Sequence, residues 1–432
     1  MNTTPAANRL HIGIFGRRNA GKSSFVNALT GQTVSIVSPV AGTTTDPVGK
    51  AMEIDGIGPV YIYDTAGIDD TGELGSMRVQ RTMAVMKKVN VAVLVTTASG
   101  CDDREKGLLS ELSTRGIPAL VVVNKIDLEP PGPALTSELD GAGVSWVAAS
   151  CVTREGIDEA RRKLVELAGA IRPEPPTIIG DLINHGDLVL LVVPIDLGAP
   201  RGRLILPQVQ VIRDILDNDA VAVIAKEREI EYALAGLSRP PALAVCDSQV
   251  VLKVSGDLPQ EVKLTTFSIL FSRLKGDLAT FVAGVTAIDT LKDGDRILIC
   301  EACTHHPLPD DIGRVKIPRW LRLYTGKDLT FETHAGPILD RDLEGYKLAV
   351  HCGGCMINRQ EMLSRMKTMR DAGVPVTNYG VAISYVHGVL DRVLEPFPYE
   401  RSMLAEREGR CRPASATPDH PSQVHKGNED DS

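Results

Sequence analysis

The fold is decided by a short stretch near the start of the chain, Gly16-Arg17-Arg18-Asn19-Ala20-Gly21-Lys22-Ser23. It fits the pattern G-x-x-x-x-G-K-[ST] and stands between an apolar run, Leu10–Phe15, and a segment of helical pattern. Glycines in such a loop allow backbone N–H groups to surround phosphate oxygens, with the help of the following helix amino terminus. The stretch therefore predicts a phosphate-binding loop, in which Lys22 neutralises phosphate charge and Ser23 ligates Mg²⁺.

Three further motifs follow in the order expected of a guanine-nucleotide site. Asp64-Thr65-Ala66-Gly67 ends the apolar run Val60–Tyr63, so that Asp64 can hold Mg²⁺ through water and the Gly67 amide can sense the γ-phosphate. Asn124-Lys125-Ile126-Asp127 ends the run Leu120–Val123. Asp127 can accept from guanine N1–H and the exocyclic amine, a donor pair that adenine lacks. Ser150 is expected to contact guanine O6 through its backbone amide.

Together these motifs define the predicted nucleotide site. The nucleotide-binding residues are Gly16, Asn19, Ala20, Gly21, Lys22, Ser23, Ser24, Asp64, Gly67, Asn124, Lys125, Asp127 and Ser150. The Mg²⁺ ligands are Ser23, Thr45 and Asp64, and the catalytic residues are Lys22, Asn19, Gly67 and Thr45. Because the four motifs occur in order and at the ends of apolar runs, GTP binding and hydrolysis is the function that they predict.

The composition indicates a globular chain of several domains. Of 432 residues, 43% are hydrophobic, 24% are charged and only 4% are aromatic. The net charge of −8 argues against a nucleic-acid partner. No segment reaches the apolar length that crosses a bilayer, and Met1–Arg9 lacks a signal-peptide core. We therefore expect a cytoplasmic protein with no membrane partner.

The order of apolar runs and helical segments predicts an α/β fold with mainly parallel sheets. The predicted parts are a P-loop domain over 1–172, two further small α/β domains over 177–262 and 263–400, and a disordered tail over 401–432. Pro173, Pro175 and Pro176 form a stiff linker after the first domain. A long helix is expected over Glu261–Thr290, and another over Ala382–Leu394.

The second predicted domain carries no catalytic motif. Its segments Leu188–Ile195 and Leu204–Leu216 are apolar enough to be fully buried. Ordinary core is the simpler interpretation, because most hydrophobic residues lie inside. A subunit interface is the alternative.

Four of the eight cysteines form two Cys-x-x-Cys pairs flanked by histidines. The pairs lie in Cys300-Glu301-Ala302-Cys303-Thr304-His305-His306 and in His351-Cys352-Gly353-Gly354-Cys355. Each follows a predicted strand, and open parallel sheets bind ligands at the carboxyl ends of their strands. We therefore expect the two groups to meet. Buried inert cysteines are the least favoured interpretation, whereas structural zinc and an iron–sulfur cluster both remain open, the cluster modestly ahead.

The first domain resembles the TrmE–Era type of GTPase. The resemblance rests on Asn19 in the phosphate loop and on Gly42-Thr43-Thr44-Thr45-Asp46 in the first switch. It implies that Asn19 is a K⁺ ligand and that Thr44 or Thr45 is a switch ligand. Ile68 stands where many regulatory GTPases place a water-orienting glutamine, so intrinsic hydrolysis is expected to be slow and to serve as a switch.

The whole chain except its tail resembles the [FeFe]-hydrogenase maturation GTPase family. The resemblance rests on Cys303-Thr304-His305, on His351-Cys352-Gly353-Gly354-Cys355, and on the segment 310–320 between them. It implies a homodimer of GTPase, dimerisation and cluster-binding domains. A [4Fe–4S] cluster is then expected on Cys303, Cys352 and Cys355, with His305 or His351 as candidate fourth ligand. Cys300 lies outside the family pattern.

The resemblance also implies a function and partners. Such a protein receives a diiron precursor bearing CO and cyanide, made with two radical-SAM maturases, and delivers it to the [FeFe]-hydrogenase apoprotein. Arg314, Lys316 and Arg319 could attract an anionic diiron species, but a solvated helix face is the simpler interpretation of these charges. The competing function is an RNA-modification or ribosome-assembly GTPase with structural zinc, and a metal-dependent redox enzyme is a weaker third.

Overall fold

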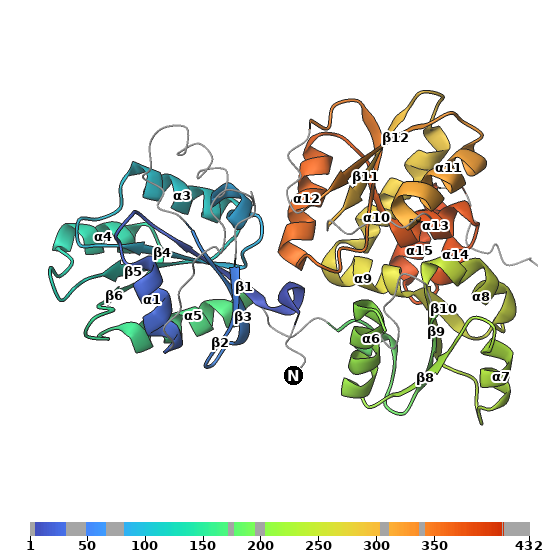
Figure 1. Cartoon of the computed structure of the whole chain (residues 1–432), viewed down its shortest axis with the longest axis horizontal. Coiled ribbons are helices and arrows are strands. Elements are labelled where there is room, and N and C mark those ends of the chain that lie inside the picture. The colour runs from blue at the N-terminus through green and yellow to red at the C-terminus, as the bar shows by residue number, and fades with distance from the viewer. Residues whose placement is uncertain are drawn as a thin grey trace, which may run out of the picture.

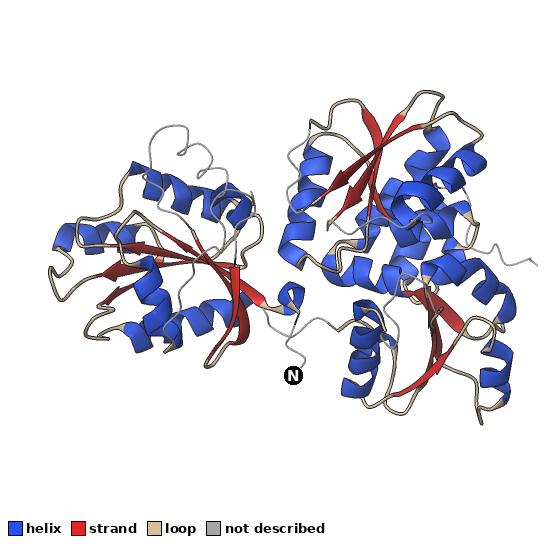
Figure 2. Ribbon diagram, viewed as in Figure 1, coloured by secondary structure: helices blue, strands red, loops and turns tan. Residues whose placement is uncertain are grey.

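The computed structural model describes residues 5–31, 49–65, 82–171, 177–194, 204–302, 311–336, 342–407 and 409. The described chain forms three α/β units, each built on one sheet (Figure 1; Figure 2). Apart from one antiparallel pair, all neighbouring strands are parallel, which confirms the predicted fold class. No helix among these residues is long and apolar enough to cross a membrane.

The first unit has a six-stranded sheet in the order β2-β3-β1-β4-β5-β6. Its strands are β1 (Leu10–Phe15), β2 (Gly49–Ile54), β3 (Gly58–Asp64), β4 (Val91–Thr96), β5 (Ala119–Asn124) and β6 (Ser145–Ala149). Its helices are η1 (Ala6–Asn8), α1 (Lys22–Thr30), α3 (Asp103–Thr114), α4 (Pro133–Gly141) and α5 (Ile157–Ile171). β2 pairs antiparallel with β3 and had no counterpart among the predicted strands.

Helices cover both faces of this sheet, as predicted. One core contains Phe25 of α1 and Leu164 of α5, and the other contains Leu112 of α3 and Leu139 of α4. β1 is buried along its whole length because it lies near the middle of the sheet. This burial holds the strand that leads into the phosphate loop.

The second unit has a four-stranded parallel sheet in the order β10-β9-β7-β8. Its elements are η2 (Gly180–Leu182), β7 (Leu188–Val192), α6 (Leu206–Asp217), β8 (Val221–Ala225), α7 (Ile230–Ala235), β9 (Leu243–Cys246), η3 (Ser248–Val250), α8 (Val251–Asp257) and β10 (Lys263–Thr266). β10 pairs with β9. The predicted division after Val262 is therefore one strand too early, since it separates β10 from its own sheet.

The third unit has a four-stranded parallel sheet in the order β12-β11-β13-β14. Its strands are β11 (Arg296–Glu301), β12 (Thr330–Ala335), β13 (Tyr346–His351) and β14 (Val376–Asn378). Its helices are α9 (Phe267–Lys275), α10 (Leu278–Val285), η4 (Thr286–Thr290), η5 (Ile312–Lys316), α11 (Ile317–Thr325), α12 (Arg359–Asp371), α13 (Tyr379–Val386), α14 (Leu390–Val393) and α15 (Pro398–Arg407).

Several predicted boundaries in this unit are wrong. The long helix expected over Glu261–Thr290 is instead β10, α9, α10 and η4. Thr266 caps α9 and Asp277 caps α10 through their side-chain oxygens, so local capping interrupts what looked like one helical stretch. The helix expected over Ala382–Leu394 is two helices, α13 and α14. α15 continues to Arg407, into the segment predicted to be disordered, whereas residues 410–432 lie outside the described chain.

The second and third units share one hydrophobic core. A single cluster of buried side chains runs from Ile178 through Val245 and Phe281 to Leu404. The first unit has its own two cores. The second and third units therefore form one packed body, and the first unit is a separately packed one.

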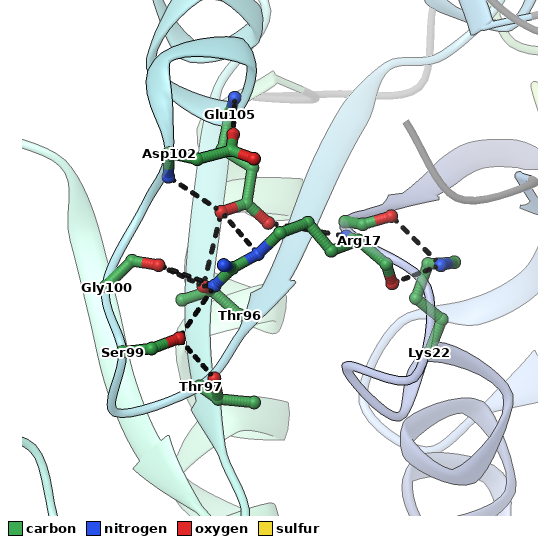
Figure 3. A network of polar contacts seen from close by, with 9 residues as sticks. Arg17, Lys22, Thr96, Thr97, Ser99, Gly100, Asp102 and Glu105 are labelled. Atoms are coloured by element: carbon green, nitrogen blue, oxygen red, sulfur yellow. Dashed lines mark hydrogen bonds and ion pairs between the residues drawn. The ribbon is translucent and has the colours of Figure 1, made fainter. Parts of the chain in front are cut away.

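An ion pair between Arg17 and Glu105 holds the phosphate loop to the start of α3 (Figure 3). Glu105 is fully buried, its Oε2 lies 3.2 Å from Nε of Arg17, and its Oε1 accepts from the Arg17 backbone amide at 3.3 Å. Asp102 and Glu105 form a reciprocal capping box at the start of α3, which holds the Glu105 carboxylate in place. Arg17 also donates to the hydroxyls of Thr96 and Ser99. The first turn of the loop is thus positioned before any nucleotide binds.

Replacing Glu105 with Ala should destabilise the first unit, because Arg17 loses its buried partner and α3 loses half of its capping box. The expected loss is about 2–4 kcal/mol in the free energy of unfolding, with weaker GDP binding. Urea unfolding and nucleotide titration measure both effects. The matched control is Glu138→Ala, which removes an exposed ion pair to Lys106 and should change little. Equal effects of the two substitutions would show that the Arg17–Glu105 pair does not hold the loop.

Candidate functional site

Two glycines give the phosphate loop its shape. Gly16 and Gly21 have φ values of 137° and 98°, in the region that favours glycine. A Cβ on Gly16 would lie 2.1 Å from the carbonyl oxygen of Val95, and one on Gly21 would lie 2.2 Å from Nδ2 of Asn124. Any other residue at either position would therefore have to push the loop away from the sheet.

Lys22 lies inside this loop. Its Nζ donates to the carbonyl oxygens of Gly16 at 2.9 Å and Arg17 at 2.8 Å (Figure 3). The ammonium group is therefore held at the mouth of the loop, where phosphate oxygens would meet it. This geometry fits the role that the sequence predicted for Lys22.

The predicted magnesium ligands of the described chain lie together. Ser23 Oγ donates to Asp64 Oδ2 at 2.8 Å, whereas Asp64 Oδ1 is buried and has no hydrogen-bond partner. Burial raises the pKa of the Asp64 carboxyl, while the Ser23 hydroxyl and the Lys22 charge oppose the rise. A hydroxyl and an orphaned carboxylate oxygen are ligands that Mg²⁺ prefers, so these residues fit the ion. Thr45 and Gly67 lie outside the described residues.

The guanine-contacting motifs are tied to the phosphate loop. Asn124 donates from Nδ2 to the carbonyl oxygen of Ala20 at 2.9 Å and accepts from the Cys151 amide at 3.2 Å. Lys125 adopts a left-handed φ of 67°, which turns the chain at the end of β5. Asn124 therefore fixes the distance between the base-binding loops and the phosphates.

Ser150 plays a different part from the one expected. Its backbone amide donates to the carbonyl oxygen of Glu155 at 2.9 Å and so is not available to guanine O6. Its hydroxyl donates to Asp127 Oδ1 at 2.6 Å. We correct the prediction accordingly: Ser150 orients the carboxylate that would contact the base.

Two further candidate residues, Asn19 and Ser24, are exposed. Asn19 lies in the phosphate loop with a φ of 61°, and Ser24 lies in the first turn of α1. The switch residues Thr44 and Ile68 lie outside the described chain. The position of Asn19 leaves its side chain open to solvent and to a bound ligand.

The second candidate site lies where β11 and β13 end side by side. Cys300 is opposite His351 in this parallel pair, and the Cys352 amide donates to the carbonyl oxygen of Cys300 at 2.8 Å. The Ala302 amide donates to Cys352 Sγ at 3.2 Å. The expectation that the two cysteine segments meet is thus confirmed as far as Ala302, the neighbour of Cys303 in sequence.

The thiols available here fit an iron–sulfur cluster in part. The thiols of Cys352 and Cys355 are half-buried, whereas Cys303 and His305 lie outside the described residues. Within the described ranges, no three metal-ligating side chains come together. Tyr379 supplies a buried hydroxyl without a hydrogen-bond partner, and burial and the nearby Cys352 raise its pKa. Soft sulfur donors beside an orphaned polar group suit a cluster that accepts hydrogen bonds at its sulfurs.

His351 is not placed to be the fourth ligand. The ring is fully buried, its Nδ1 contacts the carbonyl oxygen of Cys352 at 2.7 Å, and its Nε2 faces Arg365 at 3.3 Å. Burial, aided by Arg365, lowers the pKa of His351 to about 3, so the ring is neutral and accepts at Nε2. Both ring nitrogens are engaged, which leaves His305 as the histidine candidate.

Lys275 binds the backbone of the loop that contains Cys355, a role that the sequence did not predict. Its buried Nζ donates to the carbonyl oxygens of Gly354, Cys355 and Ile357 at 3.1, 3.2 and 2.8 Å. Burial lowers the pKa of Lys275 to about 8. The only sequence signal was an apolar helix ending in a lysine, which is too common to identify the site.

Arg314, Lys316 and Arg319 do not form a set of three exposed cations. Arg314 pairs with the buried Glu301 at 2.6 Å, and Lys316 donates to Gln249 at 2.8 Å. Only Arg319 of the three is exposed. The three side chains therefore do not act together to attract an anion.

Cys300, whose role the family pattern leaves open, is fully buried in β11.

Three family models match the chain. Residues 178–276 match the hydrogen maturase F dimerization domain, and residues 279–396 match the hydrogen maturase F tetramerization domain. Residues 11–125 match the 50S ribosome-binding GTPase model. The first unit is thus a GTPase domain, and the other two units correspond to oligomerisation domains of one family.

Among curated proteins, MnmE-type relatives match the GTPase domain of this chain. They include tRNA modification GTPases MnmE from Chromobacterium violaceum, 36% identical over 162 residues, and from Ralstonia nicotianae, 38% identical over 172 residues. Each match covers 37% of this chain, which spans 35% of the length of either relative. The match agrees with the TrmE–Era type that the phosphate loop and first switch indicated.

Among solved structures, similar chains include Era from Aquifex aeolicus bound to GDP·AlF₄⁻ and the G domain of the FeoB iron transporter from T. maritima. Era is 18% identical, with a TM-score of 0.32, over 52% of this chain and 97% of its own. The FeoB domain is 22% identical, with a TM-score of 0.30, over 37% of this chain and 99% of its own.

The two models of one maturase cover the body formed by the second and third units, and the GTPase model covers the first. The chain therefore belongs to the hydrogen maturase F family, the [FeFe]-hydrogenase maturation GTPases, with a GTPase domain of the TrmE–Era type.

Proposed function

We propose that this protein is a GTP-hydrolysing scaffold and carrier for [FeFe]-hydrogenase maturation, which holds a [4Fe–4S] cluster and delivers a diiron precursor to the apo-hydrogenase. The observation that supports it most is the pairing of β11 with β13. This pairing brings the amide of Ala302, the residue before Cys303 in the sequence, to Cys352 Sγ. Membership of the family supplies the identity of the cargo.

In this proposal the protein holds the cluster with Cys303, Cys352 and Cys355. Three thiolates leave one iron with an open position, and His305 is the candidate for a labile fourth ligand. A bound cluster of this kind supplies an iron that can bridge to the precursor. The protein's own part is to position the thiolates, with Lys275 fixing the Cys355 loop and Tyr379 offering an unpartnered hydroxyl. Two radical-SAM maturases are the proposed source of the precursor.

The GTPase domain serves as the control element. Lys22, Ser23 and Asp64 are placed for phosphate and Mg²⁺. Asn19, exposed on the phosphate loop, is proposed to hold K⁺, which would take the place of an arginine finger. Ile68 occupies the position where many GTPases have a catalytic glutamine, so GTP hydrolysis is expected to be slow. Hydrolysis would then change the binding of partners and would not perform chemistry on the cluster.

We further propose that the second unit forms the homodimer. β8 is an edge strand of its sheet and leaves Val221 and Ile224 each 48% exposed. On the neighbouring α6, Val209 and Leu216 are 47% and 57% exposed. An exposed apolar edge strand is a template for pairing with another chain. The segment Leu204–Leu216, expected to be fully buried, is thus partly open, which favours the interface interpretation.

The alternative function is an RNA-modification or ribosome-assembly GTPase with structural zinc at the cysteines. It is favoured by the likeness of the GTPase domain to the MnmE proteins and by the ribosome-binding GTPase model. That likeness stops within the first unit, which weighs against it. Metal content separates the two functions.

Replacing Cys352 or Cys355 with Ala should abolish cluster binding and leave GTP hydrolysis largely unchanged, because the two sites lie in separately packed bodies. The protein is purified without oxygen and reconstituted with iron and sulfide, and iron, zinc and the visible spectrum are measured. Cys101→Ala, which removes a half-buried thiol of the first unit, is the control and should keep full iron content. Tight zinc without iron–sulfur absorption would support the alternative function instead.

Exchange of Na⁺ for K⁺ should raise the rate of GTP hydrolysis about tenfold or more, since the cation would stabilise charge on the transferred phosphoryl group. Asn19→Gly should remove the K⁺ response. Glycine is the matched substitution because it adopts the left-handed φ of 61° without strain. GDP affinity should be retained in this variant. Equal rates in the two salts for the unaltered protein would eliminate the K⁺ site.

Placing a charge on the β8 edge with Ile224→Lys should shift the protein from dimer to monomer, because an unpaired lysine would be buried in the proposed interface. Light scattering coupled to size exclusion measures the mass. Leu128→Lys, at a residue 78% exposed in the first unit, is the control and should leave the mass unchanged. A dimer that survives the Ile224 substitution places the interface elsewhere.

A further inference from the structure

A cavity of about 460 Å³ lies between the two packed bodies of the chain. Met86, Lys87 and Arg115 line it from the GTPase domain, and residues of α10 and α12 line it from the other body. In Figure 1, α12 lies on the side of its body that faces the GTPase domain. Small-molecule sites often lie at boundaries between domains, and the volume of this cavity is in their usual range.

The wall that α12 supplies is one face of the helix. Gln360, Leu363, Ser364 and Lys367 follow one another at the spacing that places side chains on one side of a helix, and Arg370 continues the row three residues later. All five line the cavity. This face of α12 therefore presents two cations, an amide and a hydroxyl to the boundary between the bodies.

Positive charge predominates in the cavity. Of the residues that line it, Lys87, Arg115, Lys367 and Arg370 are cationic and only Asp277 is anionic. The whole chain has a net charge of −8, so this group of cations differs from the average of the protein. Like charges that face one another repel, and an anion bound between them would remove that repulsion.

The nearby carboxylates balance only part of this charge. Asp277 Oδ2 accepts from the Thr280 amide at 3.1 Å and so caps α10. Glu111 Oε1 accepts from Arg115 Nε at 2.7 Å and balances that one cation. The side chains of Lys367 and Arg370 are exposed and form no ion pair within the described chain. Their charges therefore remain for a ligand.

A buried hydrogen bond holds the two walls together. Asn358 Nδ2 donates to the carbonyl oxygen of Lys88 at 2.7 Å, and Asn358 is only 4% exposed. Lys88 follows the cavity residue Lys87, and Gln360 stands two residues after Asn358, so this bond lies beside the cavity. The bond keeps the cations of the two bodies near one another despite their repulsion.

Apolar side chains form another part of the lining. Met86 is 1% exposed and Met366 is 6% exposed, and Leu363 beside them is partly buried. Thioethers pack well against aromatic rings. Lysine and arginine bind phosphate oxygens through charge-assisted hydrogen bonds, and the arginine fork matches phosphate geometry. The lining thus suits a ligand that has both phosphate groups and an apolar or aromatic part.

We infer that this cavity binds a small organic phosphate. Its phosphate groups contact Lys87, Lys367 and Arg370, and its apolar or aromatic part contacts Met86 and Met366. The site is separate from the GTP site, because no residue of the phosphate loop or of the guanine-contacting motifs lines the cavity. It contains none of the cysteines either, so it does not depend on the proposed function.

ADP is the probe that tests this site in the full-length protein. The protein is first saturated with GDP and Mg²⁺, which fills the phosphate loop, and ADP is then titrated by calorimetry. One ADP should bind per chain, whereas adenosine, which has no phosphate, should not bind. Raising the salt concentration from about 50 mM to about 300 mM should weaken ADP binding, because salt screens exposed charges.

Substitutions on both walls locate the bound probe. Lys367→Gln and Arg370→Gln on α12, and Lys87→Gln on the GTPase domain, should each weaken ADP binding about fivefold or more, the effect of losing one hydrogen bond to a charged group. Lys327→Gln is the matched control, because it removes an exposed lysine of the same body outside the cavity. Its affinity for ADP should be unchanged. Circular dichroism establishes that each variant is folded.

Several results would overturn the inference. One is that neither ADP nor inorganic phosphate binds at millimolar concentration in low salt. Another is an equal loss of affinity in Lys327→Gln, which would show that only the overall charge matters. ADP binding that falls as the GDP concentration rises would place ADP at the phosphate loop. Binding of an RNA oligonucleotide without binding of ADP would show that the cations contact a nucleic acid and not a small ligand.

Discussion

Parallel strand pairing is the constraint on which both sites of this protein depend. Because the strands of a parallel sheet all end at one edge, residues distant in sequence meet there. In the first sheet this edge joins the phosphate loop to Asp64 and Asn124. In the third sheet the pairing of Cys300 with His351 brings the two cysteine segments together. The same geometry thus gathers the candidate residues for phosphate and Mg²⁺ at one sheet edge and candidate sulfur ligands at another.

Buried polar side chains hold each of these edges in shape. Glu105 fixes the phosphate loop through Arg17, and Lys275 fixes the cysteine loop through three carbonyl groups. His351 and Arg365 fill the space behind Cys352. Each of these groups is costly to bury unless its partners are present. The loops are therefore positioned in advance, and the residues facing outward are left free for ligands.

The described chain is divided into two packed bodies, and each carries one of the candidate sites. The second and third units share one core, whereas the GTPase domain packs on its own. Among the described residues, Asn358 Nδ2 of the second body donates to the carbonyl oxygen of Lys88 in the GTPase domain at 2.7 Å. Each candidate site therefore depends on the packing of its own body.

By itself, the sequence determined the residue types, the order of motifs and most strand positions, because G-x-x-x-x-G-K-[ST], Asn124-Lys125-Ile126-Asp127 and short apolar runs are local patterns. It also indicated that two cysteine segments would meet. Tertiary structure alone decided that both ring nitrogens of His351 already have partners, the Cys352 carbonyl oxygen and Arg365, and that the Ser150 amide is already bonded. It also decided that Lys275 and Glu105 hold the loops. Such roles depend on partners brought together by folding, and no local pattern records those contacts.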